Sequence, residues 1–527
     1  MLRRAALVAA LMALIAAPAW AQKSGGTLRV FHRDSPGSVS ILEEATISVV
    51  APISAVFNNL IRFNQHEKQN RPEFIEPELA ESWTWNADYT RLTFKLRQGV
   101  KWHDGKPFTA ADVKCTFDLL LGKSKDKLRL NPRKAWYRNL DDVVSEGDSS
   151  VIFIMKRAQP AFPMLLASGF SPIYPCHVLA AQMRTHPIGT GPFKFVEFKP
   201  NEDIKLAKNP DYWKPGRPYL DAIEWRIIPN RSTQTLAFIA GQFDMTFPYE
   251  VTVQTMRDIQ SQAPSAICDL DDTMVSMNLM VNREKPPFDD PDIRKAMMLA
   301  IDRKAFLDII MEGKGTIGGA MQTPPAGLWG LPPAILKTLP GYGPDVEANR
   351  AEARKLMEKH GYGPDKRITV QVQTRNIAQY RDPAVILIDQ LKQIYIDGDL
   401  DVVETANWFP KIARKDYTIA GNLTGSGVDD PDAYFYEHYA CGSERNYTNY
   451  CNPELEKMYE QQSMEPDQEK RKKLVWEIDK RLTEDAARPI VYRYALATCR
   501  YPKVKNITTM VNSIFNGWRF EDTWLDD

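Results

Sequence analysis

The stretch TMVSMNLMVNREKPPFDDPDIRKAMMLAIDRKAFLDII, residues 273–310, decides the fold because it places a buried strand directly before an amphipathic helix. The segment Met274–Asn282 mixes β-branched and apolar residues and stops at a Pro-Pro turn, which predicts a strand that crosses between two lobes. A helix is expected next, since Asp290 is a good N-cap and Pro291 suits the first helical position. Its predicted buried face carries apolar residues at helical spacing: Ile293, Ala296, Met297, Ala300 and Ile301.

Three motifs in this stretch resemble the start of the second lobe in solute-binding proteins of the peptide/nickel (family 5) class: N-L-x-x-N, P-F-D-D-x-x-I-R-x-A and A-I-D-R. Proteins of this class deliver ligands to ABC importers. A second match, LAESW through TFKLR to WHDGKPFTAADV within residues 79–113, is the most specific in the chain. The resemblance spans nearly all of the chain beyond residue 21. It implies an α/β, two-lobed periplasmic-binding-protein type II fold with an extra small subdomain in lobe I.

Length and charge set the outer limits of the interpretation. A chain of 527 residues exceeds what one hydrophobic core organises, so two or three domains are expected. Lys plus Arg and Asp plus Glu both total 67, which leaves no net field to attract nucleic acid or an anionic membrane. With the crossing strand as the boundary, we expect lobe I at residues 22–270 with the small subdomain at about 51–185, lobe II at 271–488, and a return to lobe I at 489–527.

The first 21 residues have the features of a secretory signal peptide. Arg3 and Arg4 precede an apolar run over residues 5–17, and Ala19-Trp20-Ala21 gives an A-x-A cleavage site before Gln22. A membrane anchor is the alternative, but the apolar run is short for a bilayer span. We therefore expect cleavage after Ala21 and a protein in the periplasm of a Gram-negative bacterium, where disulfides form.

Six cysteines follow the signal, and six thiols allow 15 pairings that sequence alone does not resolve. Cys441 and Cys451 bracket the short loop GSERNYTNY. The run N-Y-T-N-Y-C-N-P resembles a loop that dipeptide-binding relatives close with a disulfide, so the resemblance implies this pair. By elimination, the other expected pairs are Cys115 with Cys176 and Cys268 with Cys499, and buried free thiols are the alternative for those four.

Local patterns predict the main elements of both lobes. In lobe I, residues 25–33 form a strand, and Thr109 with Asp112 three residues later begins a helix. In lobe II, a strand at 368–373 and a helix at 383–396 continue a βαβ-like alternation. Further helices are expected at 345–360, 453–462 and 467–484, before residues 489–504 return to lobe I.

No arrangement of residues indicates an enzyme. The chain has no G-x-S-x-G, H-E-x-x-H or P-loop motif, and its histidines do not pair at i, i+4 spacing. The run GKGTIG at 313–318 formally fits G-x-G-x-x-G, but it follows a predicted helix instead of a strand. We therefore predict no catalytic residue, no cofactor and no metal. A secreted hydrolase and a periplasmic chaperone or sensor partner are the alternatives from other functional classes.

Ligand-binding candidates come from the resemblance. An extended zwitterionic ligand needs a cation for one end and an anion for the other. Arg375, in V-Q-T-R, lies close to the carboxylate-binding arginine of dipeptide-binding relatives, and Trp408, in A-N-W-F-P-K, resembles an aromatic of the cleft. Phe31, His32 and Arg33 end the first strand, where the family places ligand-facing groups. Structural roles, in ion pairs, in the lobe core or in a packed strand end, are the alternatives.

The chain departs from the family at the site for the ligand amine. Relatives read W-T-G-D, whereas this chain reads L-T-G-S, with Leu423 and Ser426 at the positions of tryptophan and aspartate. Asp429 and the adjacent Asp430 would supply the missing charge if the loop is shifted; otherwise the ligand lacks a free α-amine. A helix start with Pro431 in its first turn is the structural alternative for these aspartates.

The expected ligand is a peptide or peptide-like solute; the resemblance leaves opines, oligosaccharides and nickel chelates as alternatives. The expected partners are the permease and ATPase subunits of an ABC importer. We expect a monomer that closes its lobes around the ligand.

Overall fold

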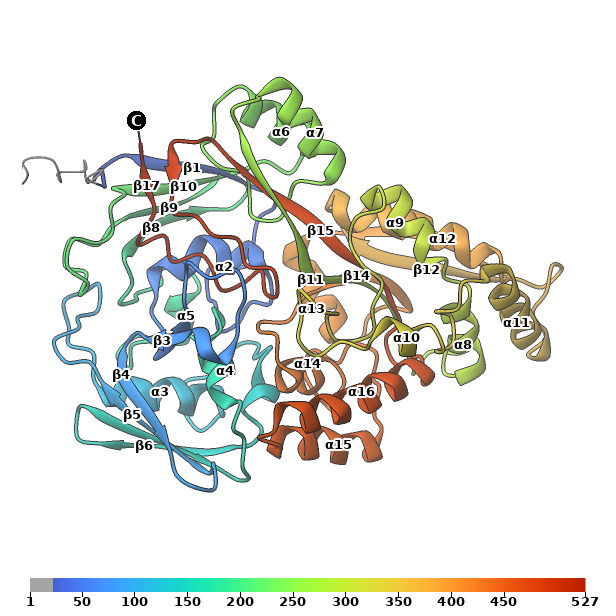
Figure 1. The fold of residues 1–527 in the computed structure, drawn as a ribbon, viewed down its shortest axis with the longest axis horizontal. Coiled ribbons are helices and arrows are strands. Elements are labelled where there is room, and N and C mark those ends of the chain that lie inside the picture. Colours follow the sequence, from blue (N-terminus) through green and yellow to red (C-terminus); the bar gives the residue numbers. More distant parts are fainter. Residues whose placement is uncertain (1–21, 527) are drawn as a thin grey trace, which may run out of the picture.

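The structure, a computed structural model, describes residues 22–526, so the predicted signal peptide at 1–21 lies outside the described residues. Two halves lie side by side and are joined by long strands that run between them (Figure 1). We call lobe I the half built on the sheet β1-β10-β9-β8, and lobe II the half built on the sheet β13-β12-β14-β11-β15. The two-lobed α/β architecture agrees with the expectation from the sequence.

The main sheet of lobe I pairs β1 with β10 in parallel, and β10, β9 and β8 with one another antiparallel. Their bounds are β1 Thr27–His32, β8 Phe193–Lys199, β9 Asp203–Lys208 and β10 Ala222–Ile227. Short helices of the same lobe are α2 Ile47–Ile53, α4 Phe162–Leu166 and α5 Ala180–Met183, and longer ones are α6 Arg231–Ile239 and α7 Val253–Gln262. The predicted strand at residues 25–33 is therefore confirmed with slightly shorter bounds.

A separate antiparallel sheet, β4-β5-β7-β6, forms the lower part of lobe I in Figure 1. The helix α3, Ala110–Leu120, packs on β6 of this sheet. It begins with a capping box in which the side chains of Thr109 and Asp112 bond to each other's backbone, as the sequence predicted. The strands of this sheet are β4 Ala80–Trp85, β5 Arg91–Leu96, β6 Leu140–Glu146 and β7 Ser150–Met155.

The long strands β11 and β15 carry the chain between the lobes. They pair antiparallel over most of their length, and Cys268 lies opposite Cys499 in the register. In lobe II, β11 also pairs with β14. The bounds of the five strands are β11 Ile267–Val281, β12 Ile368–Arg375, β13 Ile396–Val403, β14 Ile419–Thr424 and β15 Ile490–Arg500. The predicted crossing strand is thus confirmed as β11, which begins seven residues earlier than the sequence pattern indicated.

Helices cover the lobe II sheet and extend beyond it. Asp290 accepts a hydrogen bond from the backbone N–H of Asp292 and so begins α8, as predicted. The helix expected at 383–396 is instead α12, Ala378–Lys392, with Pro383 inside it; the sequence prediction treated that proline as a helix start. The helices are α8 Pro291–Leu299, α9 Arg303–Met311, α10 Pro333–Leu336, α11 Val346–Lys359, α12 Ala378–Lys392, α13 Thr405–Ala413, α14 Pro431–His438, α15 Pro453–Met464 and α16 Gln468–Glu484.

All six cysteines are joined in disulfides. Cys115 on α3 is bonded to Cys176, with Cα atoms 5.4 Å apart. Cys268 and Cys499 link β11 to β15 with a Cα separation of 4.0 Å, and Cys441 and Cys451 close their loop with a Cα separation of 4.7 Å. The disulfides therefore constrain one site in the small-sheet region, one on the crossing strands and one in lobe II.

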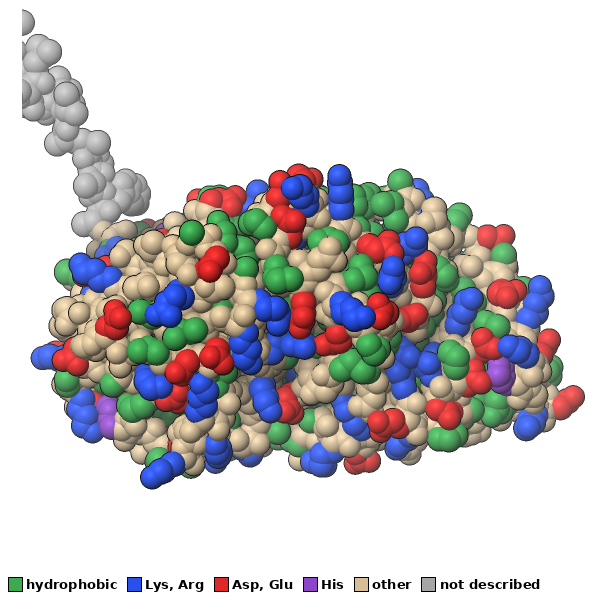
Figure 2. Space-filling model, turned by 90° about the horizontal axis from the view of Figure 1, so that it is seen from below, with side chains coloured by type: hydrophobic (Ala, Val, Ile, Leu, Met, Phe, Trp, Pro, Cys, Tyr) green, Lys and Arg blue, Asp and Glu red, His purple; other side chains and the backbone are tan. Residues whose placement is uncertain are grey.

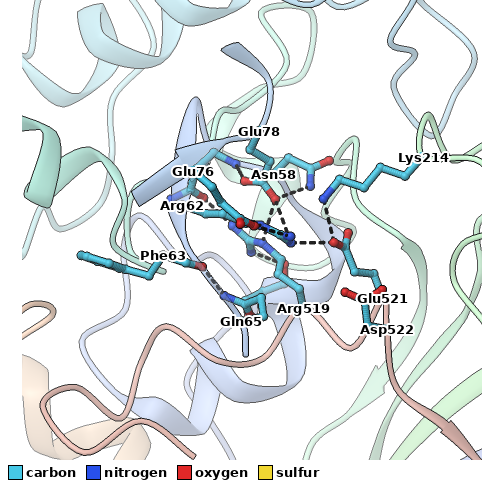
Figure 3. Close-up of polar contacts among 12 residues, drawn as sticks. Asn58, Arg62, Phe63, Gln65, Glu76, Glu78, Lys214, Arg519, Glu521 and Asp522 are labelled. Atoms are coloured by element: carbon cyan, nitrogen blue, oxygen red, sulfur yellow. Dashed lines mark hydrogen bonds and ion pairs between the residues drawn. The ribbon is translucent and has the colours of Figure 1, made fainter. Parts of the chain in front are cut away.

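The C-terminal segment returns to lobe I and is held there by a buried ion-pair network (Figure 3). Arg62 of β2 (Ile61–Phe63) contacts Glu521 at 2.7 Å and Glu76 of β3 (Ile75–Pro77) at 2.7 Å. Arg519 contacts Glu78 at 3.4 Å. A short pair of strands, β16 Val504–Lys505 and β17 Trp524–Leu525, completes the segment.

The surface carries charges of both signs. On the face in Figure 2, basic and acidic side chains are interspersed and neither sign dominates. This distribution fits the equal totals of Lys plus Arg and Asp plus Glu. Within residues 22–526, none of the helices has the length and apolar character needed to cross a bilayer.

Candidate functional site

A cleft with walls from both lobes lies beside the crossing strands. One cavity of about 540 Å³ is lined by Arg33 and Tyr249 of lobe I, by Arg375 and Gln379 of lobe II, and by Phe515 of the returning segment. A second cavity of about 700 Å³ adjoins it, and the two share Ala45, Phe409 and Arg445. Because they share these wall residues, the two cavities form one continuous region where the lobes face each other.

Arg375 lies at this cleft, and its guanidinium group is already engaged by the protein. Its Nη2 contacts the Asp34 carboxylate at 2.7 Å, and its Nη1 donates to the Tyr380 hydroxyl at 2.8 Å. The Thr405 hydroxyl accepts from Arg375 at 2.9 Å and donates to Asp34 at 2.6 Å. Asp34 follows β1 in lobe I. The sequence analysis expected Arg375 to bind the carboxylate of a ligand; in the structure it binds the carboxylate of Asp34 instead.

The same contact joins the lobes. Burial alone would raise the pKa of Asp34, but the positive charges of Arg375 and Arg33 hold it below its usual range. Gln379, near the start of α12, donates to the backbone carbonyl of Glu250 at 3.0 Å and accepts from Arg33 at 3.2 Å. Lobe I and lobe II are therefore linked at the cleft by a buried ion pair and by neutral hydrogen bonds.

Four other predicted site residues lie in packed interior. Trp408 is fully buried among Met280, Ile412, Tyr417 and Tyr447, and its neighbour Phe409 lines the cleft instead. Phe31 packs edge-on against Phe243, and His32 lies within hydrogen-bonding distance of the backbone carbonyl of Ser48. The Ser426 hydroxyl donates to the carbonyl of Val428 at 2.7 Å and is fully buried.

Asp429 and Asp430 line a different cavity, one of about 990 Å³ beside Trp83 and Trp85. Asp429 accepts from the backbone N–H of Leu328 at 3.0 Å and from the Asn512 side chain at 3.2 Å. Burial raises its pKa to about 7. Asp430 accepts two hydrogen bonds from Arg471, both at 2.8 Å, and caps α14. Of the predicted residues, Arg375 and Arg33 line the interlobe cleft.

Several cleft residues were missed by the sequence reasoning. Arg445 and Tyr447 lie in the loop that Cys441 and Cys451 close, so the GSERNYTNY run offered a signal that was used only for the disulfide. Glu44 lines the same cavity; burial raises its pKa to about 7, against the opposing effect of a hydrogen bond from Ser38. Their role depends on tertiary contacts between segments far apart in sequence.

A cluster of basic groups lies next to these cleft residues. Arg133, Arg445 and Arg488 are all buried, and they surround His438 at the end of α14. Burial lowers the pKa of His438 well below its usual value, and the charges of the three arginines lower it further. This histidine is therefore neutral in the folded protein.

One group of residues brings possible metal ligands together: Asp290, Asp292 and His360, within 4.8 Å of one another. Each already has a structural partner, since Asp290 caps α8 and Asp292 accepts from Lys359 at 2.7 Å and lies 3.0 Å from the His360 ring. This group fastens α8 to the end of α11, so we assign it a structural role.

Comparison with known proteins identifies the class. Residues 75–446 match the model of the bacterial extracellular solute-binding proteins, family 5. The chain belongs to this family. The probable di/tripeptide-binding protein 5 of Pseudomonas aeruginosa (strain UCBPP-PA14) is 24% identical over 523 residues, covering 92% of this chain and 93% of that protein. The family 5 protein described here is thus a solute-binding component of the kind that serves ABC importers.

Solved structures share its two-lobed fold. The periplasmic binding protein DppA of Helicobacter pylori, in complex with the peptide STSA, matches with a TM-score of 0.83 and 22% identity over 96% of this chain and 99% of that one. The binding protein AgaA from A. tumefacien R10, in complex with agropinic acid, matches with a TM-score of 0.79 and 23% identity over 95% and 99%. At these identities the likeness shows a shared fold.

Proposed function

We propose that this family 5 protein captures a peptide or peptide-like small solute in the cleft between its lobes and delivers it to the permease of an ABC importer. The observation that supports this best is the composition of the cleft, which takes Arg33 and Tyr249 from lobe I and Arg375 and Phe409 from lobe II. A solute held there touches both lobes at once. Because such contacts exist only when the lobes are together, binding favours the closed form.

Other parts of the proposal rest on the sequence. We propose that residues 1–21 are removed after Ala21, that the protein acts in the periplasm as a monomer, and that the ATPase acts through the permease. Lobe I would comprise residues 22–270 and 489–527, with a small subdomain at about 51–185, and lobe II residues 271–488. The return of the C-terminal segment to lobe I is consistent with this division.

The experiment is to measure closure and ligand together. Native mass spectrometry of the protein purified from the periplasm should show a retained solute of peptide size. Small-angle scattering should then give a smaller radius of gyration with the solute than after its removal by partial unfolding and refolding. Equal dimensions in the two states would contradict closure, and a protein that never carries or binds a solute would contradict the proposed function.

A second ligand class is a non-peptide acidic conjugate. The observation that favours it is the replacement of the family's tryptophan and aspartate by Leu423 and Ser426. Leu423 lines the cleft, while Ser426 bonds to its own loop. Identification of the retained solute by fragmentation mass spectrometry separates the two classes.

A further inference from the structure

Positive charge is in excess at the junction of the lobes, directly beside the cleft. Arg133 comes from lobe I, whereas Arg445 and Arg488 come from lobe II. The three side chains are buried, with exposed fractions of 3%, 5% and 3%. Buried guanidinium groups remain charged, so each requires a counter-charge or a full set of hydrogen-bond acceptors.

The protein supplies only part of that compensation. Arg445 pairs with the Glu437 carboxylate and donates to the Tyr447 hydroxyl at 3.2 Å. Arg488 donates from Nη2 to the Thr424 hydroxyl, while its Nε and Nη1 have no acceptor. Arg133 donates from Nη1 to the backbone carbonyl of Glu44, and its Nε has no acceptor.

Neighbouring groups do not close this gap. The Glu44 carboxylate accepts hydrogen bonds from Ser38 at 2.8 Å and from Arg129 at 3.4 Å, and it is not paired with the arginines of the cluster. Both ring nitrogens of His438 lack a hydrogen-bond partner. Its ring makes an edge-to-face contact with the Tyr434 ring, with the ring centroids 4.7 Å apart. Among the residues that the structure describes here, Glu437 is the one carboxylate bonded to any of the three arginines. The cluster therefore retains unmatched donors and unmatched positive charge.

The cluster reaches the cleft through several residues. Arg445 lines both cavities, and Tyr447, whose ring centre lies 5.8 Å from the Arg488 guanidinium carbon, lines the larger one. Thr424, which accepts from Arg488, directly precedes Gly425 of the smaller cavity. Pro132, which directly precedes Arg133, lines the larger cavity. An anionic group that enters from the cleft thus meets Arg445 directly, with Arg133 and Arg488 buried next to residues of the cleft wall or their immediate neighbours.

We propose that Arg445, Arg488 and Arg133 bind an anionic group of the ligand, a carboxylate in the first instance, and that the physiological solute is therefore acidic. This inference rests on the proposed function and specifies its substrate class. It also accounts for Ser426: the position where relatives carry an amine-binding aspartate is uncharged here, and the unmatched charge nearby is positive. A carboxylate held by both lobes also favours closure, because its contacts are complete only when Arg133 approaches Arg488 and Arg445.

The test uses matched pairs of ligands. The purified full-length mature protein, freed of retained solute by partial unfolding and refolding, is mixed with an equimolar library of synthetic di- and tripeptide amides. They are made as pairs that differ only by Glu or Gln at one position, so that the Glu side chain carries the one carboxylate of each pair. Bound peptides are recovered by ultrafiltration and quantified by mass spectrometry. We expect the Glu members to be enriched about tenfold over their Gln partners, because a charge-assisted hydrogen bond is roughly twice as strong as a neutral one.

Variants assign that preference to the cluster. Arg488→Gln should reduce the enrichment to below about threefold, and Arg133→Gln should do the same from the opposite lobe. Arg481→Gln is the matched control, because Arg481 is exposed on α16 and, among the described residues, its side chain pairs with Glu477. The ratio of Glu to Gln capture is an internal measure that a general loss of stability does not change. If one variant fails to fold, the other decides.

The possible results separate the two proposals. Equal capture of Glu and Gln members by the wild-type protein would overturn the acidic-ligand inference and leave solute binding intact. A tenfold preference that survives in both cluster variants would overturn the assignment to these arginines. Capture of no peptide, together with no solute retained on purification, would overturn the proposed function itself.

Discussion

Two buried arginine-rich regions of this protein differ in how their charges are matched. In the lobe I network of Figure 3, Arg62 and Arg519 face Glu76, Glu78 and Glu521. At the junction of the lobes, three buried arginines, Arg133, Arg445 and Arg488, lie near one carboxylate, Glu437, which pairs with Arg445. Each arginine of the first region contacts a carboxylate, whereas among the described residues Arg133 and Arg488 of the second region contact none. The contrast distinguishes a cluster that holds the fold together from one that is suited to an external anion.

Ionisation reports the same difference. Burial alone would raise the pKa of Glu521, but the charges of Arg62 and Lys214 lower it to about 2. Lys214 contacts that carboxylate at 2.6 Å, and the Tyr212 hydroxyl donates to it at 2.6 Å. In the junction cluster, burial and repulsion act in the same direction and keep His438 neutral. In the network with paired charges, the neighbouring cations keep Glu521 ionised. In the cluster with excess positive charge, the neighbouring cations keep His438 unprotonated.

The largest expected effect comes from breaking the matched network. Arg62→Met removes a cation that contacts Glu76 and Glu521, and it leaves buried carboxylates without their partner. We expect a loss of about 3–5 kcal/mol in the free energy of unfolding. Urea denaturation monitored by tryptophan fluorescence measures it. A loss below about 1 kcal/mol would show that the network does not hold the C-terminal segment. It would then contradict the structural role assigned to the lobe I network.

Breaking the cross-lobe pair should have the next largest effect. Asp34→Asn removes the carboxylate that Arg375 contacts at 2.7 Å. We expect a loss of about 1.5–3 kcal/mol in unfolding free energy, because a hydrogen bond to a charged group is removed from a buried site. The ligand-free protein should also open, with a larger radius of gyration by small-angle scattering. Asp308→Asn, in an exposed pair with Lys304, is the control. An unchanged radius of gyration would show that the Asp34–Arg375 ion pair does not hold the lobes together.

An unmatched carboxyl group offers a third test, through pH. Burial raises the pKa of Asp429 to about 7, so the folded protein holds this proton more tightly than the unfolded chain. The resulting stability is fully present below about pH 4 and is lost as the pH rises through about 7. Asp429→Asn removes this dependence.

Relative to the wild type, the Asp429→Asn variant should therefore gain about 1–3 kcal/mol between pH 5 and pH 8. Thermal unfolding at both pH values measures the gain. Glu44 and Asp479 also have raised pKa values, but they are common to both proteins and cancel in the difference. A constant difference across this range would show that Asp429 is ionised in the fold.

The smallest effect on stability is expected in the unmatched cluster. Arg488→Gln removes a buried charge whose Nε and Nη1 have no acceptor. We expect the unfolding free energy of the ligand-free protein to change by less than about 1 kcal/mol, or to increase. Urea denaturation of ligand-free samples gives the value. A loss as large as that of Arg62→Met would mean that Arg488 is matched within the protein, and the contrast between the two regions would disappear.

Sequence patterns predicted the elements whose cause is local. The cap at Asp290 and the box of Thr109 with Asp112 need only neighbouring residues, and both are present. The start of α12 was misplaced because Pro383 is compatible with a first turn as well as with this helix interior. The family resemblance supplied the two-lobed fold, which local patterns alone indicate only as an α/β alternation.

The candidate site was harder to predict for a physical reason. Arg375 was found from a motif, but its partner Asp34 lies 341 residues away and has no motif of its own. Arg133, Arg445 and Arg488 are similarly distant from one another and read as ordinary basic residues. Whether a charge is matched depends on tertiary neighbours and burial, which the order of residues does not reveal.

The return of the C-terminal segment has a consequence for how the chain folds. Trp518 and Phe520 are buried in lobe I, and Arg519 and Glu521 complete its ion pairs with residues near the start of the chain. During synthesis, Glu521 is made 459 residues after its partner Arg62. Lobe I therefore cannot complete these ion pairs until residues 519–521 have been synthesised, so its last folding step comes late in translation.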